Sequence, residues 1–272
     1  MLMLMVESAD DPAIGKIELI LEKLAIPSPP ISVCRPRLLD ALWQSLNSAT
    51  STVISGRTGT GKTTLALHFA ELCGRYIAWY KVDAPESELR IFLHYLIATI
   101  SKQRSNFGTG PLRRLLNTVR WDRTRSNGEL MMLAEAFVHE LESSPGPPLL
   151  IVIEDLHLVS DADWLVPFFK RLLPLLPADV HMLITSRTIP PAPLWRMRSK
   201  QTLSVIDDDM LAFTRSEAAE LFASYDLTRE QAAIAFDHSH GRAASLASLA
   251  ATLHYAETAD SGIAIPDTVR VT

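Results

Sequence analysis

The sequence predicts an α/β fold with a five-stranded parallel sheet, followed by a small α-helical subdomain. Five short apolar runs alternate with segments whose apolar residues recur at helical spacing, which is the pattern of a parallel sheet covered by helices. A glycine-rich loop at residues 56–64 joins the first run to a helix. After residue 210 the strand pattern stops, and alanine-rich helical segments follow.

Composition sets the first limits on function. The chain has 272 residues, 47% hydrophobic and 21% charged, as expected for a globular protein with one large and one smaller domain. Its net charge of −5 gives no general attraction to nucleic acid or anionic membranes. No apolar run approaches the ~18–20 residues of a membrane span. The two cysteines, Cys34 and Cys73, match no metal-binding spacing, so we expect a cytoplasmic protein with reduced thiols.

The first thirty residues are expected to precede the sheet domain. Residues 10–24 have apolar side chains at helical spacing and a proline near the start of the run, which predicts a short helix. Residues 26–30 contain three prolines and predict an extended segment. A second helix is expected over residues 36–48.

The glycine-rich loop matches the pattern G-x-x-x-x-G-K-T and lies between the β-branched run 52–55 and the helical run 65–72. Its residues are Gly56, Arg57, Thr58, Gly59, Thr60, Gly61, Lys62, Thr63 and Thr64. Strand, loop and helix in this order form a phosphate-binding loop, in which backbone N–H groups surround an anion at a helix N-terminus. We therefore expect these nine residues to bind ATP or ADP, with Lys62 reaching the β- and γ-phosphates and Thr63 holding Mg²⁺.

Arg35 is a further candidate for this site. It forms a basic pair with Arg37 just ahead of the loop, and the pair could contact base, ribose or phosphate. A solvated helix start explains the two arginines equally well.

The middle of the chain predicts one strand and two helices. The strand is expected over residues 76–80 and the helices over residues 89–100 and 129–142. The segment between the helices is basic around Trp121, with Arg113, Arg114, Arg120, Arg123 and Arg125. Arginines beside an aromatic residue suit single-stranded nucleic acid, but a solvated face is the better interpretation in an acidic chain.

Two later strands end in candidate catalytic residues. The apolar run 149–153 predicts a fully buried strand that ends in Glu154 and Asp155. Ligands bind at the carboxyl ends of strands in open α/β sheets, so both acids are expected to hold Mg²⁺ and to position the attacking water. The strand over residues 180–184 is followed by Arg187, whose guanidinium could hold two oxygens of a γ-phosphate. A surface arginine in a loop is the simpler alternative for Arg187.

These residues give a domain plan and a candidate site. With a last strand over residues 203–206, we expect an N-terminal segment at 1–30, a sheet domain at 31–210, and a helical lid subdomain at 211–272, either whole or truncated. Thr214 to Glu217 fit a capping box, Thr228 is a second helix cap, and Gly241 precedes a third helix. The candidate catalytic residues are Lys62, Glu154, Asp155 and Arg187, and the candidate Mg²⁺ ligands are Thr63, Glu154 and Asp155.

Several of these stretches together resemble the MalT-like, LuxR-type large ATP-binding transcriptional regulators, within the STAND class of signal-transduction ATPases. The resemblance covers about residues 23–250. It is carried by V-x-R-P-R-L-L from Val33, I-A-W from Ile77, F-x-x-Y-L from Phe92, E-D-x-H from Glu154, S-R-x-x-P-P-x-x-L from Ser186 and L-x-F-T-x-x-E-A from Leu211. The family usually has Asp at the first of these acids and Gly-Trp where this chain has Gly241-Arg242.

The resemblance implies a P-loop NTPase of the AAA-like (ASCE) type that acts as a switch. ATP would bridge the sheet domain and the helical subdomain and favour a self-associating form, whereas ADP would hold a closed one. We therefore expect a slow Mg²⁺-dependent ATPase module of a signal-responsive transcriptional regulator, which contacts DNA only through domains outside this chain. The alternatives are an AAA-like motor or loader ATPase acting on DNA or protein, and a non-hydrolysing, ADP-bound interaction scaffold.

Overall fold

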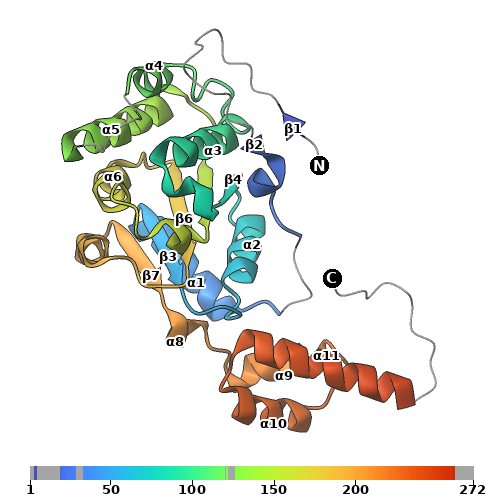
Figure 1. The fold of residues 1–272 in the computed structure, drawn as a ribbon. Helices are drawn as coiled ribbons and strands as arrows, with labels where there is room; N and C mark the ends of the chain where they lie inside the picture. The colour runs from blue at the N-terminus through green and yellow to red at the C-terminus, as the bar shows by residue number, and fades with distance from the viewer. Residues whose placement is uncertain (1–2, 5–18, 29–32, 120, 122–125, 261–272) are drawn as a thin grey trace.

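A five-stranded parallel sheet forms the centre of the fold in the computed structural model, which describes residues 3–4, 19–28, 33–119, 121 and 126–260. The strand order is β4-β5-β6-β3-β7, and every neighbouring pair is parallel (Figure 1). The strands are β3 (Ser51–Ser55), β4 (Tyr76–Lys81), β5 (Leu149–Glu154), β6 (Val180–Ser186) and β7 (Leu203–Ile206). The predicted parallel sheet is confirmed, with each strand close to its expected position.

Helices cover both faces of the sheet because successive side chains of a strand point to opposite faces. On one face, α1 (Pro36–Ser48) and α2 (Lys62–Leu72) pack against a cluster that includes Ile54, Val152 and Leu183. On the other face, α3 (Leu89–Ser101), α5 (Asn127–Ser143) and α6 (Leu165–Leu172) pack against a cluster that includes Val53, Ile151 and Ile184. The neighbouring residues of each strand therefore belong to different cores.

The N-terminal segment differs from its prediction in the part that the structure describes. Instead of a helix, β2 (Leu19–Ile20) pairs antiparallel with β1 (Met3–Leu4), and the 3-10 helix η1 (Leu21–Leu24) follows. The backbone N–H of Ile20 donates to the Tyr95 hydroxyl at 3.1 Å, so a contact with α3 replaces the local helical hydrogen bond. The rest of the expected helix, residues 10–18, lies outside the described residues.

The basic segment around Trp121 contains an unexpected helix, α4 (Pro111–Thr118). The Trp121 indole N–H donates to the carbonyl of Leu116 at 2.9 Å, and its ring packs against the core that includes α4. This side chain therefore serves the packing of α4. Arg120, Arg123 and Arg125 lie outside the described residues.

Short elements complete the sheet domain. These are the 3-10 helices η2 (Ala84–Ser87), η3 (Leu156–Val159), η4 (Leu173–Leu175) and η5 (Arg196–Lys200) and the short helices α7 (Ala192–Trp195) and α8 (Asp208–Leu211). The described part of the chain contains no helix long and apolar enough to cross a membrane.

Three helices form the C-terminal subdomain, which lies below the sheet domain in Figure 1. They are α9 (Arg215–Ala223), α10 (Arg229–Ser239) and α11 (Ala243–Asp260), around a small core that includes Phe213, Leu221 and Leu246. The expected caps are present, since Thr214 with Glu217 and Thr228 with Gln231 both form capping boxes. These three helices thus have a small core of their own and follow α8 in the chain.

Candidate functional site

The loop between β3 and α2 depends on its glycines. Gly59 and Gly61 have φ angles of 79° and 86°, in the left-handed region that glycine adopts without strain. Gly56 is required for a different reason, because a Cβ at this position would lie 2.7 Å from Oδ1 of Asp208. The chain therefore passes so close to the side chain of Asp208 here that only glycine fits.

Lys62, the first residue of α2, folds back over this loop. Its ammonium donates to the carbonyl of Gly56 at 2.6 Å and to that of Arg57 at 2.9 Å. An ammonium group has three protons, so the loop carbonyls engage two of them. Burial lowers the pKa of Lys62, the negative charge of Asp155 opposes this, and the positive charge of Arg187 lowers the pKa further. Asp155 and Arg187 therefore lie within electrostatic reach of the loop.

Thr63 and Glu154 meet at the carboxyl end of the sheet. The Thr63 hydroxyl donates to Oε1 of Glu154 at 2.6 Å, and the indole N–H of Trp79 donates to Oε2 of the same carboxylate at 3.2 Å. Glu154 is only 4% exposed. Both of its oxygens thus have a partner.

This arrangement fits Mg²⁺. Because the Thr63 hydroxyl gives its proton to the carboxylate, its lone pairs remain for a cation. Magnesium is usually bound by one or two carboxylates together with substrate phosphates, so it needs no cage of protein ligands. Among the described residues, no three His, Cys, Asp or Glu side chains form such a cage. Thr63 and Glu154 would hold the ion, with Asp155 next to Glu154 in sequence.

Asp155 turns the chain sharply after β5. Its φ is 60°, and its backbone N–H donates to the Thr185 hydroxyl at the end of β6, at 3.1 Å. The ring nitrogen Nδ1 of His157 lies 3.7 Å from Oδ1 of Asp155. His157 is half-buried, and neither of its buried ring nitrogens has a hydrogen-bond partner within the described part of the chain.

His157 and Arg187 complete this group of side chains. Burial lowers the pKa of His157, Asp155 opposes the shift, and the charges of Arg187 and Lys62 lower it further. Arg187 itself is exposed. The sequence prediction brought Lys62, Asp155 and Arg187 together but omitted His157, although it stands in the E-D-x-H stretch that carried the family resemblance.

The helical subdomain rests directly on the phosphate-binding loop. The backbone N–H of Ala244, in the first turn of α11, donates to the carbonyl of Gly59 at 2.8 Å. The side chain of Arg242 donates to the carbonyl of Thr58 at 2.9 Å. A Cβ at Gly59 would lie 2.7 Å from that of Ala244, so the close approach requires glycine. No sequence pattern indicated this contact.

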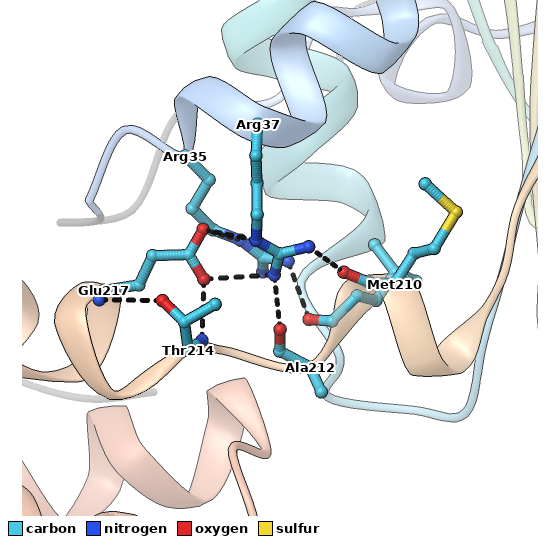
Figure 2. A network of polar contacts seen from close by, with 7 residues as sticks. Arg35, Arg37, Met210, Ala212, Thr214 and Glu217 are labelled. Carbon is cyan, nitrogen blue, oxygen red and sulfur yellow. Dashed lines mark hydrogen bonds and ion pairs between the residues drawn. The ribbon is translucent and has the colours of Figure 1, made fainter.

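Two arginines at the start of α1 hold the connection between the domains (Figure 2). Arg37 donates to both carboxylate oxygens of Glu217, at 3.0 and 3.1 Å, and to the carbonyls of Met210 and Ala212, at 2.6 and 2.5 Å. Arg35 donates to the carbonyl of Leu211 at 2.7 Å. We call this group of contacts the hinge clamp.

Arg35 is the more buried of the two clamp arginines. It is 6% exposed, and its guanidinium lies 4.6 Å from the centre of the Phe213 ring. Burial lowers its pKa to about 10, although Glu217 opposes this shift. The sequence offered a nucleotide contact or a solvated helix start for Arg35, and the solvated position is wrong because the side chain is buried in the hinge clamp. Arg35 also lines a cavity beside the phosphate-binding loop.

A cavity of about 230 Å³ lies between the two domains. The phosphate-binding loop and α2 contribute Gly59, Gly61, Thr64 and Leu65, the segment before α1 contributes Val33 and Arg35, and the helical subdomain contributes residues that include Phe213, Ala243 and Ala247. Its walls are mostly apolar, with polar groups near the loop.

Comparisons with known proteins agree with this architecture. The profile of the AAA ATPase domain matches residues 32–185. The transcriptional regulator MalT of Serratia proteamaculans is 30% identical over 192 residues, and that of Vibrio campbellii is 25% identical over 192 residues. Each alignment covers 70% of this chain and 20% of the relative, so the chain spans about a fifth of the curated relatives that it matches. The predicted resemblance to MalT-like regulators is confirmed.

Solved structures with a similar fold share little sequence. A STAND protein with a tetratricopeptide repeat sensor from Pyrococcus horikoshii is 19% identical, with a TM-score of 0.49 over 82% of this chain and 30% of that chain. Drosophila ORC bound to DNA is 14% identical, with a TM-score of 0.50 over 83% of this chain and 61% of that chain. The similarity to Drosophila ORC is one of fold alone.

Proposed function

The chain belongs to the AAA ATPase domain family, and from this premise we propose that it is an ATP-binding, slowly hydrolysing switch module of a signal-responsive transcriptional regulator. One observation carries the proposal: the first turn of α11 donates to the phosphate-binding loop itself, from Ala244 to Gly59. A nucleotide that fills the cavity beside this loop would also touch the helical subdomain, which lines the same cavity. Nucleotides that contact the subdomain differently will therefore favour different positions of it.

The phosphates would occupy the loop at the N-terminus of α2. Lys62 is proposed to reach the β- and γ-phosphates, exchanging the carbonyls of Gly56 and Arg57 for phosphate oxygens. Thr63 and Glu154 are proposed to hold Mg²⁺, which when bound neutralises charge on the phosphates. The rest of the nucleotide fits the mostly apolar cavity between the domains, which begins at the loop and passes Thr64 and Phe213.

Asp155 is proposed to orient the attacking water. Unlike Glu154, whose two oxygens both accept hydrogen bonds, Asp155 has no hydrogen bond to its carboxylate from Thr63 or Trp79 and faces His157. The imidazole of His157 lies 3.7 Å from this carboxylate without a hydrogen bond to it, so the Asp155 oxygens remain available to a water molecule. Arg187 is proposed to contact the γ-phosphate, since it directly follows β6 at the carboxyl end of the sheet, where ligands bind in folds of this kind.

Slow turnover would follow from the contact between Ala244 of the helical subdomain and Gly59 of the phosphate-binding loop. A product held between the loop and the docked subdomain leaves only when the hinge opens, and such opening limits many enzymes. We therefore expect hydrolysis to reset the switch, with ADP retained in the closed form. The MalT relatives are transcriptional regulators, which supports a role in transcription, and DNA binding is proposed to belong to domains outside this chain.

Two measurements on the purified chain test this proposal. The steady-state ATPase rate, with and without DNA, should stay well below ~1 s⁻¹, whereas working enzymes reach ~1–10³ s⁻¹. A higher rate, or strong stimulation by DNA, would support a motor or loader ATPase instead. Nucleotide analysis after purification should find ADP that exchanges for ATP, and ADP that never exchanges would indicate a permanently closed scaffold.

A further inference from the structure

A buried tryptophan lies beside the proposed magnesium ligands. Trp79 is 1% exposed, and its indole N–H donates to Oε2 of Glu154 at 3.2 Å. An indole has one donor and no acceptor, so this contact favours a carboxylate that accepts. The site described so far gives Trp79 no role.

The sheet register explains how the two side chains meet. Trp79 on β4 pairs with Val152 on β5, so Glu154 stands two residues further along the neighbouring strand. Residues at this diagonal position share a face of the sheet, and a large aromatic side chain can reach across. Trp79 packs in the cluster under α2, which begins at the phosphate-binding loop. Packing therefore fixes the indole of Trp79 independently of its hydrogen bond to Glu154.

We propose that Trp79 is a positioning residue that holds Glu154 in the orientation in which it binds magnesium beside a nucleotide. The inference rests on the proposed function of this site. Glutamate has one more rotatable bond than aspartate, so its carboxylate loses more freedom when it is fixed. With Thr63 on one oxygen and Trp79 on the other, both ends of the carboxylate are held. Partners of this kind that orient a metal ligand typically change metal affinity about 10- to 100-fold when they are removed.

The test compares Trp79→Phe with Trp164→Phe. Trp164 is also buried, at 7% exposed, and its indole N–H donates to the carbonyl of Ser87 at 2.6 Å. It belongs to the core on the other face of the sheet. Both variants therefore remove an aromatic N–H donor from a buried site, and only one of them removes it from Glu154.

The readout is the ratio of the ATP dissociation constants without and with Mg²⁺, measured by calorimetry in EDTA and in excess magnesium. In Trp79→Phe this ratio should fall about tenfold, while the constant in EDTA stays as in the unaltered protein. Trp164→Phe should change neither value. Loss of affinity in EDTA as well, or a ratio equal to that of Trp164→Phe, would overturn the inference.

The result in the unaltered protein separates this inference from the function on which it rests. If that protein binds no ATP under either condition, the proposed function itself is wrong. If it binds ATP equally well with and without magnesium, nucleotide binding stands and the role of Trp79 is refuted.

A second measurement does not require the Trp79 variant to fold. In ¹H–¹⁵N spectra of the unaltered protein, one indole resonance should shift when magnesium is added to the ATP complex. The same resonance should shift in the Glu154→Gln variant, because both changes act on the acceptor of the Trp79 hydrogen bond. If no single indole resonance responds to both changes, Trp79 does not position Glu154.

Discussion

Glu217→Gln is expected to loosen the helical subdomain without damaging it. Glu217 is 6% exposed, and its side chain accepts two hydrogen bonds from Arg37 that belong to the hinge clamp. It also caps α9 by accepting from the backbone N–H of Thr214 at 2.9 Å. Glutamine serves as well as glutamate in a capping box, so the substitution removes the charge but keeps the cap.

The size of the expected loss in docking free energy follows from the geometry of the contact between Arg37 and Glu217. A hydrogen bond to a charged group contributes about 1.5–3 kcal/mol, but the Arg37 side chain is 37% exposed and solvent screens the pair. We therefore expect a loss of about 1–1.5 kcal/mol in docking free energy. That is about a tenfold rise in the population with the subdomain undocked.

Hydrogen exchange at the start of α11 measures this population. The amide of Ala244, which donates to Gly59 in the docked form, should exchange about tenfold faster in Glu217→Gln, and ADP should dissociate faster to a similar degree. Asp237→Asn is the matched control, because Asp237 forms an exposed ion pair with Arg215 inside the same subdomain. Equal exchange in the two variants would show that the hinge clamp does not hold the subdomain.

Three further predictions concern single residues. Lys62→Ala should weaken ATP binding at least about 100-fold in calorimetry, because it removes the charge aimed at the phosphates, and unchanged affinity would refute the site. Asp155→Asn should leave ATP affinity intact and slow single-turnover hydrolysis about 10²- to 10⁴-fold, and an unaltered rate would remove Asp155 from the chemistry. His181 is buried beside Thr52, at 2.9 Å, and burial lowers its pKa from 6.5 to about 4. The unfolded chain therefore takes up this proton first, so the stability from neutral His181 is complete above pH ~6.5 and declines as pH falls toward ~4, by about 1–3 kcal/mol. Unfolding by denaturant across this range measures the decline, which His181→Gln should reduce if the reasoning holds.

Much of the fold could be predicted because its signals are local. Each strand is a short run of β-branched or apolar residues, and the helix expected over residues 36–48 is α1 (Pro36–Ser48). The helix expected over residues 10–24 fails in its described part because Ile20 bonds to Tyr95, 75 residues away. Helix α4 was missed because its two buried apolar residues, Leu112 and Leu116, stand among arginines.

In the candidate site, too, the features with a local sequence signal could be predicted and those that depend on distant residues could not. The loop and the two acids after β5 follow from pattern and order, since their spacing along the chain is characteristic. The contacts that position them join residues far apart in sequence: Trp79 and Glu154 are separated by 75 positions, and Arg37 and Glu217 by 180. Such pairs are fixed by the sheet register and by the docking of the helical subdomain, which no local pattern encodes.

The position of the helical subdomain with different nucleotides tests the account most directly. Spin labels at exposed positions 40 on α1 and 248 on α11, with Cys34 replaced by serine, report the distance between the domains. We expect one narrow distance distribution with ADP and a longer or additional distance with a non-hydrolysable ATP analogue and Mg²⁺. Identical distributions with both nucleotides, at saturating concentrations, would contradict the proposal that this site is a switch.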